Sequence, residues 1–232
     1  IYFLLLATIL IASCKPGSKT NNRSEGKQVI TVTLEPLRYL TEAIAGDRFT
    51  VVSMVPKGTS PETYDPTPQQ LVELARSKAY FRIGYIGFEQ TWTDKLTDNA
   101  PHLQFFDMSQ GVDLIYDNTH VHHHTANEKE HQHAIGVEPH IWNSAVNAQI
   151  IAGNILSALR NIDKGNEDFY LERYNTLCRK IEHTDSLIRQ TLATPGADHA
   201  FMIYHPALSY FARDYGLHQI PIEAGGKEPS PA

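Results

Sequence analysis

Strand-like and helix-like segments alternate along residues 29–106, and this alternation constrains the fold more than any other feature of the sequence. Four segments are rich in β-branched or apolar residues and read as strands: Val29–Leu34, Thr50–Val55, Tyr80–Gly84 and Leu103–Phe106. A helix-like segment follows each of the first three, with apolar residues three or four positions apart, and the third of these helices is predicted from Phe88 to Leu96. Strands that alternate with helices form a parallel, doubly wound sheet, so we predict an α/β fold.

Local signals mark where two of these helices begin or end. Pro36 opens the first helix and Gly46 closes it. In the run Thr67-Pro68-Gln69-Gln70, Thr67 has the position of an N-cap, Pro68 that of the first helical residue and Gln70 that of the N3 residue of a capping box. The sequence therefore predicts a second helix that begins at Pro68.

The second half of the chain predicts two further helices and then a return of the strand–helix pattern. Helical spacing covers about Ser144–Asn161 and about Asn166–Leu192, and the second of these helices would be roughly 40 Å long, enough to cross between two small domains. A strand at Ala200–Tyr204, a helix at Pro206–Tyr215 and a strand at Gln219–Ile222 follow. We predict two lobes, each a small, mainly parallel sheet flanked by helices.

We expect the sequence to be incomplete in the second lobe. The N-terminal lobe would cover residues 29–165, and residues 193–232 would be only the start of the C-terminal lobe. Two strands are too few for an independent sheet, so the simplest explanation is a C-terminal truncation.

The N-terminus indicates export and a lipid anchor. Residues 1–13 are apolar but too short for a spanning helix, as in the core of a signal peptide. Ile11-Ala12-Ser13-Cys14 resembles the bacterial lipobox, in which the cysteine is lipidated, and residues 14–28 have the polar composition of a flexible tether. A plain secretory signal with an incidental Cys14 is the alternative. Because an initiator Met and a basic segment before Ile1 are missing, we expect the sequence to be clipped here as well.

Charge and cysteine content exclude several classes of function. The chain has 20 Lys and Arg against 26 Asp and Glu, a formal net charge of −6, which argues against nucleic acid as a partner. Its two cysteines, Cys14 and Cys178, cannot form a disulfide framework or an all-cysteine zinc site.

Histidines gather in one polar tract, Thr119–His133. Imidazoles this close together in a loop bind Zn²⁺, Cu²⁺ or Ni²⁺ but cannot fix a coordination geometry. We treat them as accessory metal ligands, and a merely soluble low-complexity loop is the alternative. The six residues are His120, His122, His123, His124, His131 and His133.

Three short loops near strand ends or helix starts carry candidate ligands. Glu62 lies in the loop Gly58–Pro66, His140 in the segment from Val137 to Trp142, and His205 directly after a predicted strand. Ligands of open α/β sheets bind outside the carboxyl ends of the strands, where Glu62 and His205 are expected. Taken alone, His140 would be a packed loop residue and Glu62 a solvated one, but their joint placement favours a binding site.

These motifs together resemble a known family. From Val29 to Pro231 the sequence is similar to the zinc/manganese solute-binding proteins of ABC transporters, the ZnuA/TroA-like family, and the His-rich acidic loop is similar to that of its zinc-importing members. The matching motifs occur in the family's order: the lipobox, G-x-x-P-[ligand]-x-Y-[acid]-P-T-P at Gly58–Pro68, E-P-H-I-W at Glu138–Trp142, Y-H-P-A-L-S-Y-F-A-R-D-Y-G-L at Tyr204–Leu217 and a second-lobe segment at Gly225–Pro231.

The resemblance implies a fold and a ligand set. Members of this family have two α/β lobes joined by one long helix, which falls here on residues 166–192, and they bind one divalent cation in the cleft between the lobes. His140 and His205 match the family's two central His ligands, whereas Glu62 replaces the usual first His. A carboxylate still suits Zn²⁺ or Mn²⁺, and the family's fourth ligand, a carboxylate, would lie beyond position 232.

The implied function is capture of Zn²⁺, or alternatively Mn²⁺, outside the cytoplasm and its delivery to an ABC transporter permease. The protein would be a periplasmic or cell-surface lipoprotein, held on the membrane through Cys14, and not an enzyme. One alternative is a metal-buffering or adhesin lipoprotein that uses the His tract alone. A secreted zinc hydrolase is a weaker alternative because the HExxH motif is absent and Glu138 is a poor substitute for its general base.

Overall fold

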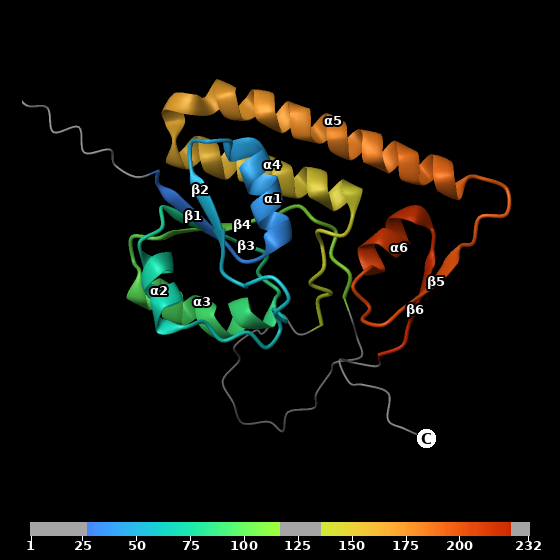
Figure 1. Ribbon diagram of the computed structural model, residues 1–232, viewed down its shortest axis with the longest axis horizontal. Helices are drawn as coiled ribbons and strands as arrows, with labels where there is room; N and C mark the ends of the chain where they lie inside the picture. The colour runs from blue at the N-terminus through green and yellow to red at the C-terminus, as the bar shows by residue number, and fades with distance from the viewer. Residues whose placement is uncertain (1–26, 117–135, 224–232) are drawn as a thin grey trace, which may run out of the picture.

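The computed structural model describes residues 27–116 and 136–223 of the chain, which form two parallel sheets and the helices around them (Figure 1). The predicted signal peptide, Cys14, most of the tether and the six histidines of the tract lie outside the described residues. Among the helices of the described part, none combines the length and apolarity needed to cross a membrane.

The larger sheet has four parallel strands in the order β2-β1-β3-β4. They are β1 (Val29–Val32), β2 (Thr50–Ser53), β3 (Ala79–Arg82) and β4 (Gln104–Asp107). Ile30 pairs with Val51 on one side and with Ala79 on the other, which makes β1 a central strand. The predicted α/β fold is confirmed, and all four carboxyl ends lie along one edge of the sheet.

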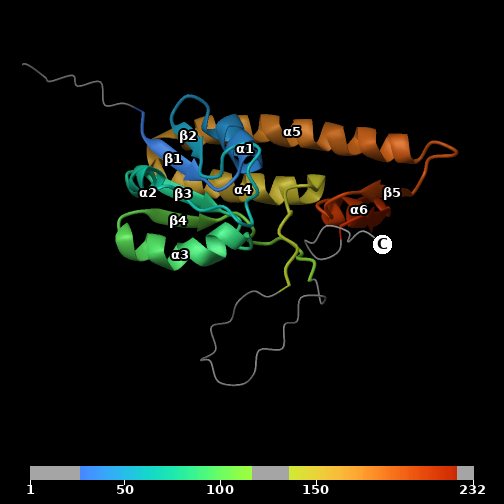
Figure 2. The same cartoon turned by 60° about the horizontal axis from the view of Figure 1, so that its bottom comes forward.

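Helices cover both faces of this sheet (Figures 1 and 2). On one face lie α1 (Glu35–Ala45), α4 (Ala145–Ile162) and α5 (Glu167–Leu192), and on the other lie α2 (Pro68–Ala75) and α3 (Gly87–Asn99). Because both faces are covered, three of the four residues in each of the central strands β1 and β3 are buried.

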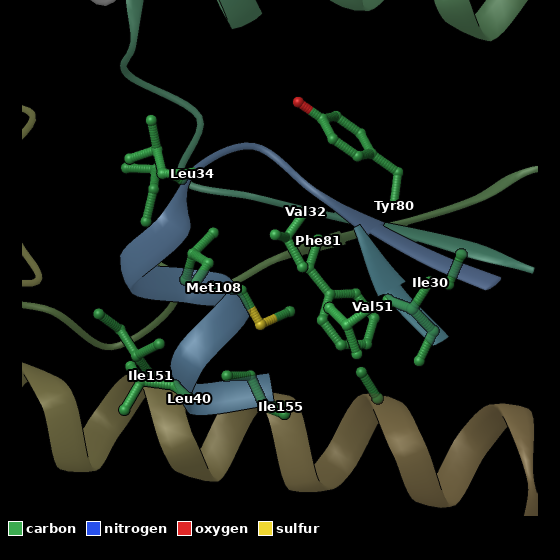
Figure 3. Packing of buried hydrophobic residues seen from close by; sticks show 14 of the residues in the cluster. Ile30, Val32, Leu34, Leu40, Val51, Tyr80, Phe81, Met108, Ile151 and Ile155 are labelled. Atoms are coloured by element: carbon green, nitrogen blue, oxygen red, sulfur yellow. The ribbon is translucent and has the colours of Figure 1, made fainter. Parts of the chain in front are cut away.

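The main core lies between the sheet and α4. Figure 3 shows Phe81 and Met108 packed above Ile151 and Ile155 of α4, while Tyr80, one residue away on β3, points to the opposite face. This alternation is the two-residue period of a strand. All five side chains are fully or almost fully buried.

The predicted helix-end signals are confirmed at both positions. Gly46 ends α1 with a positive φ of 60°, and the Thr67 side chain accepts a hydrogen bond from the Gln70 backbone in a complete capping box. Two other helices differ from expectation. The helix predicted from Phe88 to Leu96 extends to Asn99, and the helix predicted from Pro206 begins only at Ser209, because Ala207 N–H donates to the His205 carbonyl at 2.7 Å in a tight turn.

The second lobe lies near the far end of α5, beyond the carboxyl edge of the larger sheet (Figure 1). The 26 residues of α5, preceded by the short 3-10 turn Lys164–Asn166, extend roughly 39 Å. The chain then forms β5 (Ala200–Ile203), α6 (Ser209–Tyr215) and β6 (His218–Pro221), and the two strands pair in parallel. The domain limits expected from the sequence remain a prediction.

Candidate metal centre

His140 lies in a loop that is anchored on its C-terminal side by the start of α4. Ser144 caps this helix by accepting a hydrogen bond from Asn147 N–H at 3.1 Å. The Asn147 side chain in turn donates to the Ile141 carbonyl at 3.0 Å, and the Ile141 side chain is fully buried. The loop therefore has a fixed path one residue after His140.

A carboxylate of the same loop holds the His140 ring. Glu138 Oε1 contacts His140 Nδ1 and also accepts the His140 backbone N–H at 3.0 Å. Both side chains are largely buried, with 12% and 14% exposure, and the Trp142 ring lies 5.2 Å from the imidazole. These contacts engage Nδ1 and leave Nε2 as the free ring nitrogen.

His205 has the same arrangement with a carboxylate from the segment that directly follows β6. Its Nδ1 lies 2.9 Å from Glu223 Oε2, and Glu223 N–H donates to the Tyr204 carbonyl at 3.0 Å. The parallel pairing of β5 with β6 brings Glu223 beside His205 although they are 18 positions apart. The His205 side chain is 47% exposed, whereas Glu223 is only 13% exposed.

The structure brings these two histidines together. Their ring centres lie 5.1 Å apart with an angle of 74° between the ring planes. Two imidazoles on one tetrahedral Zn²⁺, with Zn–N bonds of 2.0–2.1 Å, have ring centres about 5 Å apart. A histidine whose one ring nitrogen is held by a carboxylate presents the other nitrogen to a metal, and both histidines meet this condition.

Glu62 is placed differently. It is exposed, and its Oε2 accepts the backbone N–H of Gly87, the first residue of α3, at 3.1 Å. The carboxylate there is stabilised by the positive end of the helix dipole. In the two described ranges, no group of three or more His, Cys, Asp or Glu side chains could hold a metal ion, so Glu62 does not join the histidine pair in this arrangement.

Tyr210 of α6 connects the second lobe to the loop that carries His140. Its hydroxyl donates to the Glu138 carbonyl at 2.8 Å and accepts Ile115 N–H at 3.1 Å. The side chain is fully buried, and burial raises the pKa of Tyr210 to about 12, so the hydroxyl stays protonated and can donate. The residue pattern predicted neither a role for Tyr210 nor these partners.

Glu89 is a buried acid that the sequence did not reveal. It lies on α3 with 1% exposure and accepts hydrogen bonds from the Thr33 hydroxyl and from Ile83 N–H, the latter at 2.8 Å. Burial raises its pKa, although these hydrogen bonds act in the opposite direction. Glu89 thus fixes the start of α3, the helix whose first residue holds Glu62.

Comparison with known proteins agrees with this geometry. Residues 30–232 match the family model described as zinc-uptake complex component A, periplasmic. The high-affinity zinc uptake system protein ZnuA of Bacillus subtilis is 26% identical over 248 residues, which cover 100% of this chain and 73% of that protein. The manganese ABC transporter substrate-binding lipoprotein PsaA of Streptococcus mitis is 28% identical over 224 residues, covering 94% and 68% of the two chains.

Solved structures show the same fold. A crystal structure of ZnuA superposes with a TM-score of 0.77 at 34% identity, covering 88% of this chain and 74% of that one. A ZnuA deletion mutant with zinc bound gives a TM-score of 0.75, also at 34% identity, covering 88% and 73%. The two-lobed prediction and the family resemblance are therefore confirmed, and the chain belongs to the family of zinc-uptake complex component A, whose members are extracytoplasmic metal-binding proteins of ABC transporters and not enzymes.

Proposed function

We propose that this protein captures Zn²⁺ between its lobes, through His140 and His205, and delivers it to an ABC transporter permease. The observation that carries the proposal is the spacing of the two rings, 5.1 Å between centres, with each Nδ1 held by a carboxylate. Two nitrogen ligands are then preset for one ion, and neither ring has to be reoriented before binding.

We assign the third ligand to Glu62. Its carboxylate is exposed and accepts one hydrogen bond, from the backbone N–H of Gly87. This hydrogen bond can break when the carboxylate binds an ion. A set of two imidazoles and one carboxylate suits both Zn²⁺ and Mn²⁺, and the harder oxygen ligand makes the site more acceptable to Mn²⁺ than a set of three imidazoles would be.

The relatives support both ions as cargo. The Bacillus subtilis relative is named for zinc uptake and the Streptococcus mitis relative for manganese transport, and the latter is named a lipoprotein. We accordingly keep Mn²⁺ as the alternative cargo and propose that Cys14 carries the lipid anchor. The His tract at 119–133 would raise the local metal concentration near the pair without fixing a geometry.

A zinc titration against a competing chelator tests this assignment. Wild type should bind one equivalent of Zn²⁺ tightly. The variants H140A and H205A should each lose this tightly bound equivalent, because one imidazole and Glu62 are too few protein ligands for a specific zinc site. H183A, which removes an exposed histidine of α5, is the matched control and should bind as the wild type does.

Two results would contradict the proposal. Unchanged tight binding in both H140A and H205A would place the ion elsewhere. Loss of the tight equivalent on deletion of residues 119–133 would make the His tract the main site and the pair between the lobes secondary.

A further inference from the structure

A polar cavity lies at the amino edge of the larger sheet, the edge opposite the carboxyl ends of the strands. Its volume is about 290 Å³. Its polar lining comes from the segments that lead into three neighbouring strands, β1, β3 and β4. These residues are Gln28, Arg76, Ser77, Lys78, His102 and Gln104.

The cavity contains cations that no described carboxylate neutralises. Arg76 and Lys78 form no ion pair within the described residues, whereas Arg38, Arg189 and Arg213 each pair with an acid. The nearest acid along the chain, Glu73, accepts a hydrogen bond from Gln69 at 2.8 Å, so its carboxylate is turned toward the preceding turn of α2. In a chain with a net charge of −6, a cavity with two such cations and no acid in its lining is locally positive and attracts anions.

The walls of the cavity are fixed by hydrogen bonds. The buried Ser77 hydroxyl lies 2.7 Å from the Thr31 hydroxyl, and Lys78 N–H donates to the Val29 carbonyl at 2.7 Å. The His102 ring donates from Nε2 to the Ala75 carbonyl at 2.5 Å, which sets its orientation at the end of α2. The cations therefore project from a rigid frame and not from mobile loops.

We propose that this cavity binds a phosphate-type anion. An Arg guanidinium binds two phosphate oxygens with paired N–H donors, and a Lys ammonium adds a point charge, while the amides of Gln28 and Gln104 can donate to the remaining oxygens. The volume of about 290 Å³ is just below the range for ligand pockets, about 300–1,000 Å³, which suits one small group.

Two sources could supply this group, a free phosphate or the headgroup of an anionic lipid. Gln28 lies at the end of the predicted tether from Cys14, and a tether of this length reaches at most about 50 Å when extended. The cavity would thus remain within reach of a membrane surface, so both sources are to be distinguished by experiment.

Titration of the metal-free protein with inorganic phosphate, followed by amide chemical shifts, tests the cavity. Wild type should show saturable shifts at Gln28, Lys78 and Gln104, and the double variant R76Q/K78Q should bind at least tenfold more weakly. The control K164Q/R179Q removes the same two charges from exposed positions outside the cavity and should bind as wild type does. Equal thermal midpoints would verify that the variants fold.

The same titration with dihexanoyl phosphatidylglycerol identifies the source. Tighter binding of this lipid than of inorganic phosphate, lost in R76Q/K78Q and absent for dihexanoyl phosphatidylcholine, assigns a lipid headgroup. Binding of inorganic phosphate alone assigns a free phosphate. If wild type shows no saturable binding of either probe, or if R76Q/K78Q binds as wild type does, the proposal is overturned, whatever the outcome of the zinc experiments at the opposite edge.

Discussion

At the scale of single residues, the two imidazoles of the proposed metal centre differ in how firmly they are held. His140 is 12% exposed and bonded within its own loop, whereas His205 is 47% exposed and depends on Glu223 of another segment. The orientation of His205 therefore rests on one carboxylate contact, which makes Glu223 a positioning residue.

We expect the variant E223Q to bind Zn²⁺ about 10–100-fold more weakly, which is the usual effect of removing a carboxylate that orients a histidine ligand. Chelator competition measures the change, and thermal unfolding checks that the fold is retained. The matched control E172Q alters an exposed glutamate of α5 and should have no effect. Wild-type affinity in E223Q would mean that Glu223 does not orient the ligand.

Glu62 should set the choice of metal. Replacing a carboxylate oxygen with an imidazole nitrogen favours Zn²⁺ over Mn²⁺, so we expect E62H to raise the ratio of the Mn²⁺ to the Zn²⁺ dissociation constant by about tenfold or more. Both constants are measured by competition on the same protein. An unchanged ratio would remove Glu62 from the ligand set.

Glu89 should make stability depend on pH in a defined direction. Because burial raises its pKa above the ordinary value of 4.5, the folded state holds the proton more strongly than the unfolded state does. Its contribution to stability is therefore greatest below pH 4.5 and declines as the pH rises through the folded pKa. We expect the free energy of unfolding of wild type, minus that of E89Q, to fall from pH 4.5 upward in chemical denaturation. A constant difference would contradict the raised pKa.

The sequence predicted the residues that carry short motifs but not their partners. His140 and His205 were identified from their motifs, and the structure brings them together. Glu138 was considered only as a weak general base, and Glu223 and Glu89 were not identified at all. Their roles depend on strand pairing and helix packing, which a pattern of residue types does not encode.

At the scale of elements, the junction between the loop that carries Glu62 and the start of α3 depends on a glycine. A Cβ added at Gly87 would lie 2.5 Å from the Glu62 carbonyl oxygen and 3.0 Å from its Oε2. Both contacts are closer than normal van der Waals distances, so a side chain here must displace the loop.

We expect G87A to lower the free energy of unfolding by about 1–3 kcal/mol, as overpacking commonly does, and to weaken zinc binding because Glu62 moves. Urea denaturation and chelator competition measure the two effects. G165A is the control, since a Cβ there meets nothing within 4 Å and its φ is not positive. Equal free energies of unfolding for G87A and G165A would show that the loop carrying Glu62 can move without destabilising the fold.

Element types were well predicted because each segment is either strictly periodic or capped. The six strands within residues 27–116 and 136–223 were all predicted, and the capping box at Thr67 and the glycine at Gly46 gave the correct helix ends. The errors occurred where these signals are absent. Residues 97–99 are polar and extend α3 without an apolar position to mark them, and the turn at His205 delays α6 although Pro206 is a favourable first helical residue.

At the scale of the whole molecule, the lobes are connected by α5 and by hydrogen bonds near the proposed metal centre. Asn143 donates to the Ala207 carbonyl at 2.9 Å, and Tyr210 of the second lobe bonds to backbone groups of Glu138 and Ile115 in the first. The Ser144 hydroxyl also donates to Asp214, and Arg213 donates to the Asp113 carbonyl at 2.7 Å, so several polar contacts together set the relative placement of the lobes.

We expect Y210F to reduce the free energy of unfolding by about 1–3 kcal/mol, because two partly buried backbone groups lose their partner. Hydrogen exchange should also rise at Ile115, whose N–H is then unpaired. Y204F is the matched control, since the Tyr204 side chain is 51% exposed. Equal stability of Y210F and Y204F would show that the lobes do not rely on this contact.

The position of the histidine pair has a consequence for turnover in the cell. His140 precedes α5 in the sequence and His205 follows it. An ion bound to both would therefore act as a reversible cross-link between the two lobes. At a free metal concentration 1,000 times the dissociation constant, such binding stabilises the folded state by about 4.1 kcal/mol. Since proteases cleave unfolded chains, the loaded protein would survive longer than the empty one, and metal supply would regulate the amount of its own carrier.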